Sequence, residues 1–207
     1  MTESAWFDHV PVAVESLAEA CVRYRERYGL GWAGEGRHPE GTITRAIPLG
    51  ATCYIELLEC YDSALPYGQA VREALAGNRP LLGLAIEVDD IDALARRVGV
   101  PATEGTVELE DGTVGRWATV GAGDELPFFI RYARSHRQRV EANRERVAAA
   151  GHDIEPTGIA WVELGGDEQS LREWVGAVDL DLRFVGGEPG IRRFAIATKG
   201  GAIVFEP

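Results

Sequence analysis

The sequence is poor in cysteine, and the three that it has do not suggest disulfide or metal chemistry. Cys21, Cys53 and Cys60 are an odd number without metal-ligand spacing, so we expect buried, reduced thiols. The chain also lacks any run of about 18 apolar residues, and its N-terminus has no basic segment followed by an apolar stretch. These absences predict a cytoplasmic protein that is neither secreted nor inserted into a membrane.

Positive charge is scarce as well. The 21 Lys and Arg residues are outnumbered by 33 Asp and Glu residues, which gives a net charge of -12. Nucleic acids and anionic membranes favour clustered basic residues, so neither is an expected partner. No Ser-His-Asp order, phosphate loop, dinucleotide fingerprint or Cys–His pair identifies a reaction. The remaining composition, 45% hydrophobic and 26% charged over 207 residues, is that of a globular protein.

Hydrophobic periodicity predicts the same succession of elements three times: a strand, a helix and three strands. The first copy has a strand over residues 7–14, a helix over 17–28, and strands over 31–34, 42–48 and 53–60. The second has a strand over 82–88, a helix over 91–98, and strands over 106–110, 114–120 and 126–133. The third has a strand over 159–164, a helix over 167–178, and strands over 182–185, 192–198 and 202–206. Three copies spaced by about 75 residues predict an α+β fold of repeated βαβββ units that form curved mixed sheets.

The repeat sets the expected domain boundaries. These are one domain over residues 1–134, made of units 5–62 and 80–134, and a third unit over 155–207. Residues 135–154 between them are predicted to form a linker helix, in which interleaved arginines and glutamates indicate a solvated surface. His136 and His152, in or near this helix, are expected at the protein surface.

Four short segments connect this pattern with a known superfamily. They are Phe7-Asp8-His9-Val10, Gly36-Arg37-His38-Pro39 followed by Gly41-Thr42, Tyr54-Ile55-Glu56-Leu57-Leu58, and Leu126-Pro127-Phe128-Phe129-Ile130. In this order they resemble the DHV, GRHP…GT, YLEL and LPFFI segments of the glyoxalase-like members of the vicinal oxygen chelate superfamily. The resemblance covers the first two units and implies that their sheets pair into a cup. It implies a fold and does not by itself settle an activity.

Metal-using members of that superfamily take a His or Gln from the first strand and a Glu from the last strand of each of two units. The resemblance therefore implies metal donors at His9 and Glu56. Strand alternation gives the same placement independently. Val10 and the other apolar residues at every second position must face the helix, so His9, Tyr54 and Glu56 are expected to face the cup. A His and a Glu on one concave face suit a divalent cation or an acid–base pair.

The second unit lacks matching donors. Its alignment with the first unit places Gly83 at the position of His9 and Arg131 at the position of Glu56. Glycine has no ligating side chain, and arginine brings a permanent positive charge that repels a cation. A four-ligand site and a bound cofactor are therefore not expected, although a divalent metal held by His9 and Glu56 stays open.

Three interpretations of these residues remain. Arg131 could replace the metal as electrophile for a carboxylate, enolate or phenolate, with His9 or Glu56 moving protons. A buried Glu56–Arg131 ion pair without a catalytic role is the second, and a metal held by His9 and Glu56 is the third. His38 lies in a Gly/Pro-rich segment that is either a lid over the cup or an exposed turn, and Trp117 is either a pocket wall or a core residue.

Two classes of function follow. One is a lyase or isomerase acting on a small oxygenated or aromatic, anionic molecule, with catalytic His9, Glu56 and His38 and with binding by Arg131, Tyr54 and Trp117. The other is a non-catalytic small-molecule binding or drug-sequestering protein of the same fold. A protein whose cup is filled by its own side chains is a third, weaker alternative.

The odd number of units leaves one sheet without a partner. A homodimer that pairs third units would cover this sheet, and Ile159 and Trp161 are expected on the covered face. Cover from within the chain, by the linker helix or by another unit, is the competing solution.

Overall fold

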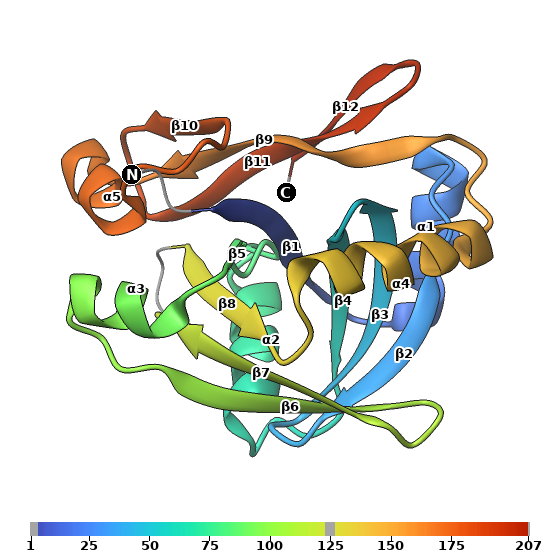
Figure 1. Cartoon of the computed structure of the whole chain (residues 1–207). Helices are drawn as coiled ribbons and strands as arrows, with labels where there is room; N and C mark the ends of the chain where they lie inside the picture. The colour runs from blue at the N-terminus through green and yellow to red at the C-terminus, as the bar shows by residue number, and fades with distance from the viewer. Residues whose placement is uncertain (1–3, 123–126, 207) are drawn as a thin grey trace.

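A computed structural model describes residues 4–122 and 127–206 (Figure 1). These residues form a closed eight-stranded barrel and a separate four-stranded sheet, which lies over the barrel as a second layer. Leu126, expected at the start of a strand, lies outside the described residues.

The predicted order of elements is present three times. The first unit consists of β1 (Ala5–Val14), α1 (Leu17–Tyr28), β2 (Ala33–His38), β3 (Thr42–Gly50) and β4 (Cys53–Cys60). After α2 (Pro66–Ala76), the second unit consists of β5 (Ala85–Val88), α3 (Ile91–Val98), β6 (Thr103–Leu109), β7 (Val114–Val120) and β8 (Phe128–Tyr132). After α4 (His136–Ala150), the third consists of β9 (Pro156–Gly165), α5 (Glu168–Val175), β10 (Leu182–Val185), β11 (Gly190–Thr198) and β12 (Gly201–Phe205). The α+β class with three βαβββ units is confirmed.

The helices of the three units begin and end at residues suited to these positions. The side chains of Ser16, Asp90 and Asp167 each accept a hydrogen bond from the backbone N–H three residues later, which satisfies a free donor of the first turn. Gly29 and Gly99 end α1 and α3 with φ of 68° and 73°, a left-handed conformation that glycine adopts without strain. Local sequence therefore determines where these helices stop.

The first two units close on each other to form the barrel. In each of them the first strand is parallel to the last, β1 beside β4 and β5 beside β8. Antiparallel pairs β1–β5 and β2–β6 then join the two units. The closed barrel has no free strand edge, and its interior is separated from the core outside it.

The main core lies on the outside of the barrel wall. Val10, Val12 and Val14 belong to it together with Leu17 of α1. His9, which alternates with these valines, lines the barrel interior instead. The strand thus separates a hydrophobic outer side from a polar inner side.

The third unit repeats the element order but not the strand pairing. Its strand order is β10-β9-β11-β12, so its first strand pairs with its second and third rather than with its last. Its apolar face is covered within the chain: Phe205 packs on Tyr24 and Tyr28 of α1, with ring centroids at 5.9 and 4.4 Å. The indole N–H of Trp174 donates to the Pro127 carbonyl at 2.7 Å and fixes α5 against the second unit. This face needs no second copy of the chain to cover it.

Ile159 and Trp161 do not share a face, contrary to the expectation. A register shift in the β9–β11 ladder places Ile159 and Trp161 opposite the consecutive residues Ile196 and Ala195. Such a bulge changes the side to which the following residues point. Ile159 is buried in the core, whereas Trp161 is half-buried below the guanidinium of Arg183, 4.1 Å from its ring centroid.

Helix α4 is more than a solvated linker. It runs along β2 and β3, and one of its sides contributes Arg139, Ala142, Asn143 and Arg146 to the wall of the barrel cavity. Asn143 is buried and donates to the Gly50 carbonyl at 3.4 Å. Within residues 4–122 and 127–206, no helix is long and apolar enough to cross a membrane.

Candidate active site

The barrel encloses a cavity of about 1280 Å³. This exceeds the roughly 300–1,000 Å³ of an ordinary small-ligand site, so the cavity can hold a sizeable molecule. Strands of both units and helices α2 and α4 form its wall. Its aromatic lining consists of Tyr54, Tyr67, Trp117, Phe128 and Tyr132.

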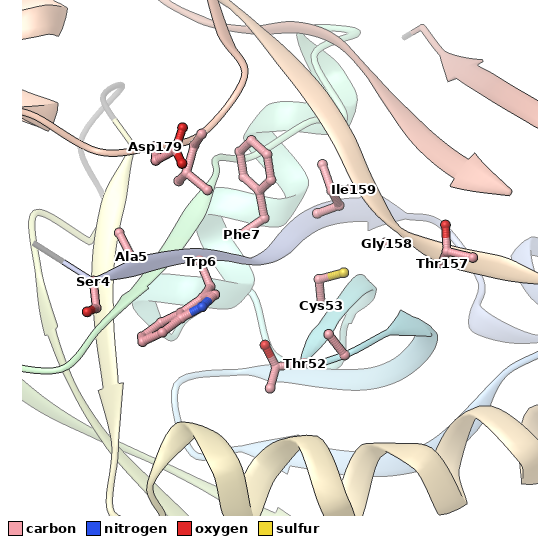
Figure 2. Close-up of a pocket in the computed structure, with 12 residues that line it drawn as sticks. Ser4, Ala5, Trp6, Phe7, Thr52, Cys53, Thr157, Gly158, Ile159 and Asp179 are labelled. Atoms are coloured by element: carbon pink, nitrogen blue, oxygen red, sulfur yellow. The ribbon is translucent and has the colours of Figure 1, made fainter. Parts of the chain in front are cut away.

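A second cavity of about 510 Å³ lies between β1, β4 and β9, outside the barrel (Figure 2). Trp6, Phe7, Cys53 and Ile159 are among its lining residues. Burial raises the pKa of the Cys53 thiol to about 11, so the thiol is protonated at neutral pH and is a poor nucleophile. Cys53 is therefore not a candidate nucleophile in this second cavity.

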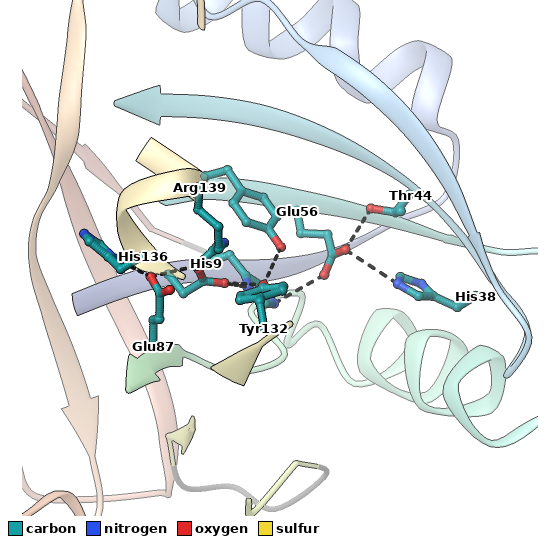
Figure 3. A network of polar contacts seen from close by, with 10 residues as sticks. His9, His38, Thr44, Glu56, Glu87, Tyr132, His136 and Arg139 are labelled. Carbon is teal, nitrogen blue, oxygen red and sulfur yellow. Dashed lines mark hydrogen bonds and ion pairs between the residues drawn. The ribbon is translucent and has the colours of Figure 1, made fainter. Parts of the chain in front are cut away.

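His9 and Glu56 meet inside the barrel (Figure 3). They lie on the adjacent parallel strands β1 and β4, where Pro11 pairs with Glu56 and His9 with Tyr54. The Nε2 atom of His9 is 3.4 Å from the Glu56 carboxylate, and only 5% of His9 and 8% of Glu56 is exposed. The structure thus brings together two of the residues selected from the sequence.

Asp8 orients His9 from the other side of the imidazole. Its carboxylate lies 2.6 Å from His9 Nδ1, and it also accepts hydrogen bonds from Tyr132 at 2.7 Å and from Arg139 at 2.5 Å. Burial alone would raise the pKa of Asp8, but Arg139 and the hydrogen bond from His9 hold it below its usual value. An ionised carboxylate can only accept hydrogen bonds, so Nδ1 must carry a proton and Nε2 is left to face Glu56 and the cavity.

Glu56 is held by a second set of contacts. Its Oε1 accepts a hydrogen bond from Thr44 at 3.1 Å and lies 3.8 Å from His38 Nε2 (Figure 3). Its other oxygen faces His9. Two imidazoles therefore flank one carboxylate, at ion-pair distances of 3.4 and 3.8 Å.

His38 belongs to a strand of the barrel wall. Both expectations for its segment, a lid over the cup and an exposed turn, are therefore wrong. Strand β2 covers residues 33–38 rather than the expected 31–34, and His38 at its end is 5% exposed. Its Nδ1 lies 2.9 Å from the Thr42 hydroxyl, and Tyr61 donates to its carbonyl at 3.1 Å. The barrel pairing of β2 with β3 and β6 extends this strand through a Gly-rich segment that local propensity predicts to be a loop.

Arg131 does not face Glu56, and this expectation is wrong. Arg131 pairs with Ala118 and is exposed, whereas the neighbouring pair Trp117–Tyr132 lines the cavity. The alignment of the two units was displaced by one residue on β8, and in a strand such a displacement exchanges the two faces. A buried Glu56–Arg131 ion pair is thereby excluded.

Gly83 lies before β5 and beside Phe128, whose ring would be 3.6 Å from a Cβ atom at this position. Phe128 in turn contacts the His9 imidazole edge-on, with ring centroids 5.6 Å apart. The Phe128 ring therefore lies where a four-ligand metal site would need a donor side chain from the second unit.

Tyr54 and Trp117 both line the cavity. The Tyr54 ring stacks on His9 at 4.8 Å, and its hydroxyl is 3.4 Å from that of Tyr132. Burial raises the pKa of both tyrosines well above the usual value, so they are neutral hydrogen-bond donors. Trp117 is half-buried and meets His38 edge-on at 6.0 Å.

Helix α4 supplies the groups that sequence reasoning missed. Arg139 bridges Asp8 and Glu87, with its Nη1 2.6 Å from the Glu87 carboxylate. His136, expected at the surface, lies 2.7 Å from Glu87 and stacks on Trp6 with a centroid distance of 3.8 Å. The spacing of three residues between His136 and Arg139, which puts both on one helix face, was the available signal.

The donor set does not fit a metal ion. In the described part of the chain, no group of three or more His, Cys, Asp or Glu side chains is arranged to hold one. Thr44 donates a hydrogen bond to Glu56, the imidazoles of His9 and His38 lie 3.4 and 3.8 Å from it, and Asp8 is bound by Arg139.

A barrel of two βαβββ units around a central cavity defines the vicinal oxygen chelate class of folds. The chain belongs to the glyoxalase-like domain family, whose family model matches residues 7–178. Among curated proteins, no sequence matches this chain.

Several solved structures are similar to part of this chain. A hypothetical protein from Bacillus halodurans is 22% identical, with a TM-score of 0.49 over 64% of this chain and 98% of the other. Methylmalonyl-CoA epimerase from Mycobacterium tuberculosis is 23% identical (TM-score 0.47; 62% of this chain and 88% of the other). A Streptomyces coelicolor methylmalonyl-CoA epimerase variant, in complex with 2-nitronate-propionyl-CoA, is 20% identical (TM-score 0.44; 62% and 94%). At these identities and TM-scores, the similarities do not identify a ligand or a reaction for this chain.

Proposed function

We propose that this protein is an enzyme of the lyase or isomerase type that moves a proton on a small, oxygenated, anionic substrate. The observation that carries the proposal is the buried series Asp8–His9–Glu56, with His9 Nε2 directed into a large cavity. A histidine whose tautomer is fixed by a buried carboxylate is the arrangement of an effective general base.

In this mechanism the substrate lies beside His9 Nε2 and Glu56. Nε2 takes a proton from an acidic C–H or O–H bond, and Asp8 stabilises the resulting imidazolium. The electron pair left behind moves onto a substrate oxygen, which the neutral Tyr54 hydroxyl stabilises by donating a hydrogen bond. The proton then returns, directly or through Glu56, to another substrate atom in an isomerase or to a departing oxygen in a lyase.

Phenylpyruvate in D2O tests the proposal, because this compound is aromatic, anionic and acidic at C3. The wild type should accelerate deuterium incorporation at C3, measured by NMR. His9→Gln and Glu56→Gln should each reduce the acceleration by roughly 10²–10⁴-fold, the usual contribution of a positioned proton carrier. Arg131→Gln is the matched control and should have no effect, since Arg131 is exposed and outside the cavity.

Non-catalytic binding of a small molecule is the second candidate, supported by the size of the cavity and by its aromatic lining. The same experiment separates the two. Binding of phenylpyruvate, measured by isothermal titration calorimetry, without accelerated exchange would favour sequestration over catalysis.

A further inference from the structure

Three glycines lie on the inner face of three neighbouring strands of the barrel. Gly36 of β2, Gly105 of β6 and Gly115 of β7 all line the cavity, and these strands are adjacent in the order β2-β6-β7. The interior of an eight-stranded barrel is narrow enough for ordinary side chains to fill it. The three inward-facing glycines therefore keep one part of the interior open.

Two larger side chains of the same wall lie across these glycines. Gly105 pairs with Trp117, and a Cβ atom on Gly105 would be 2.6 Å from Cε2 of the indole. Val107 pairs with Gly115, where a Cβ atom would be 2.9 Å from its Cγ1. A Cβ atom on Gly36 would be 2.7 Å from Cγ2 of the same valine. Real Cβ atoms essentially never come so close to another atom, so both side chains take these positions only because the glycines beside them have none.

The indole of Trp117 has no stacking partner in the protein. It lies over the Gly105 backbone, lines the cavity and is half-buried. His38 meets it edge-on at 6.0 Å, and the Tyr132 ring is tilted by 57° at 6.4 Å. Among the described residues, no ring lies parallel to it. An aromatic side chain in this position is able to stack on a planar group of a ligand.

This wall adjoins the groups that would carry out the reaction. His38, which contacts Trp117, has its Nε2 3.8 Å from the Glu56 carboxylate. Tyr132, the other ring beside Trp117, donates to the Asp8 carboxylate at 2.7 Å. A group that lies on the indole is therefore a short linker away from a reacting atom at the catalytic residues.

We infer that the substrate of the proposed enzyme is an aromatic acid whose ring stacks on Trp117, in a chamber that the three inward-facing glycines keep open. This inference rests on the proposed function, which places the oxygenated end of the substrate at His9 and Glu56. Gly105 is then a specificity-determining residue, because any side chain at this position displaces the indole into the space of the ring. The cavity of about 1280 Å³ has room for both ends of such a molecule.

Isothermal titration calorimetry tests the inference with two acids that differ only in the ring, 3-phenylpropanoate and 3-cyclohexylpropanoate. The cyclohexyl acid has the larger apolar surface, so burial alone would favour it. Stacking on Trp117 should reverse this order, and the wild type should bind the phenyl acid about two- to tenfold more tightly. Equal affinities, or tighter binding of the cyclohexyl acid, would overturn the inference and assign the chamber to an aliphatic group.

Two variants locate the effect. Trp117→Leu keeps an apolar side chain without a ring, so it should abolish the preference for the phenyl acid. Gly105→Ala should weaken binding of the phenyl acid by about fivefold or more, because the added methyl group displaces the indole. Gly186→Ala is the matched control: its Cβ atom would have no other atom within 4 Å, and it should bind both acids as the wild type does.

A preference that persists in Trp117→Leu, or unchanged binding by a folded Gly105→Ala, would refute the ring chamber. If far-UV circular dichroism shows that Gly105→Ala does not fold, Trp117→Leu decides by itself. His9→Gln should lose proton exchange and keep the preference for the phenyl acid. Failure of the proposed function is therefore distinguishable from failure of this inference, in which exchange is accelerated and the ring preference is absent.

Discussion

Arg139 of α4 donates to the Asp8 carboxylate of β1 at 2.5 Å, and its guanidinium lies 3.6 Å from the centroid of the Tyr132 ring. A helix between the second and third units thus holds the residue that orients His9. The ion pairs with Asp8 and Glu87 outweigh the effect of burial and raise the pKa of Arg139. The barrel alone, without α4, would leave two buried carboxylates without a cation.

Arg139→Ala should destabilise the protein by about 3–5 kcal/mol, because removal of one partner leaves buried charges uncompensated. Urea unfolding followed by tryptophan fluorescence measures this. Arg137→Ala, an exposed change on the same helix, is the control and should lie close to the wild type. Equal stability of the two variants would show that the contact of Arg139 with Asp8 contributes little.

Asp8→Asn should reduce proton-transfer activity by roughly 10²–10⁴-fold, because the neutral amide no longer fixes the tautomer of His9.

The same variant should also change how the free energy of unfolding depends on pH. The pKa of Asp8 is lowered by folding, so its carboxylate stabilises the native state above the unfolded pKa, ordinarily 3.8, and this contribution is lost as pH falls through the folded pKa. The stability difference between the wild type and Asp8→Asn should therefore shrink as pH falls below about 3.8.

The control for this pH series is Asp92→Asn, an exposed change of equal charge on α3. Its stability difference from the wild type should change less over the same pH interval. A constant difference for Asp8→Asn across this interval would mean that Asp8 is not an ionised partner of Arg139.

Removal of divalent metal should leave activity unchanged, because no three His, Cys, Asp or Glu side chains of the described residues are arranged to hold a metal ion. Dialysis against a chelator, followed by the phenylpyruvate exchange assay, checks this. Activity that disappears and returns on addition of Zn²⁺ or Mn²⁺ would instead assign His9 and Glu56 to a metal.

Homodimer formation stays a prediction. The face of the third unit that was expected to form the interface is covered within the chain, so the expected interface is now the edge of its sheet. Strand β12 is at the edge of its sheet, and Val204 on it is 42% exposed, so both its backbone groups and an apolar side chain could meet a second copy. Light scattering at low micromolar concentration should show a dimer for the wild type and a monomer for Val204→Lys. Val22→Lys on α1, where valine is 52% exposed, is the control and should remain dimeric. A monomeric wild type would refute the prediction.

The sequence determined the repeated units and the inward position of His9 and Glu56. Both follow from short-range physics: capping residues bound the helices, and strict alternation with buried valines allows His9 only one face of β1. The order of elements could be predicted even for the third unit, because hydrophobic periodicity depends only on local spacing.

Tertiary structure decided the strand register and the long-range contacts, which the local spacing of residues does not determine. A bulge separates Ile159 from Trp161, and a displacement of one residue on β8 puts Tyr132 in the cavity in place of Arg131. The role of α4 was equally inaccessible, because Arg139 is 131 residues from Asp8 in sequence and meets it only after the barrel has closed. Side-chain direction within one strand is a local property, whereas the partner of a buried charge depends on how distant elements pack.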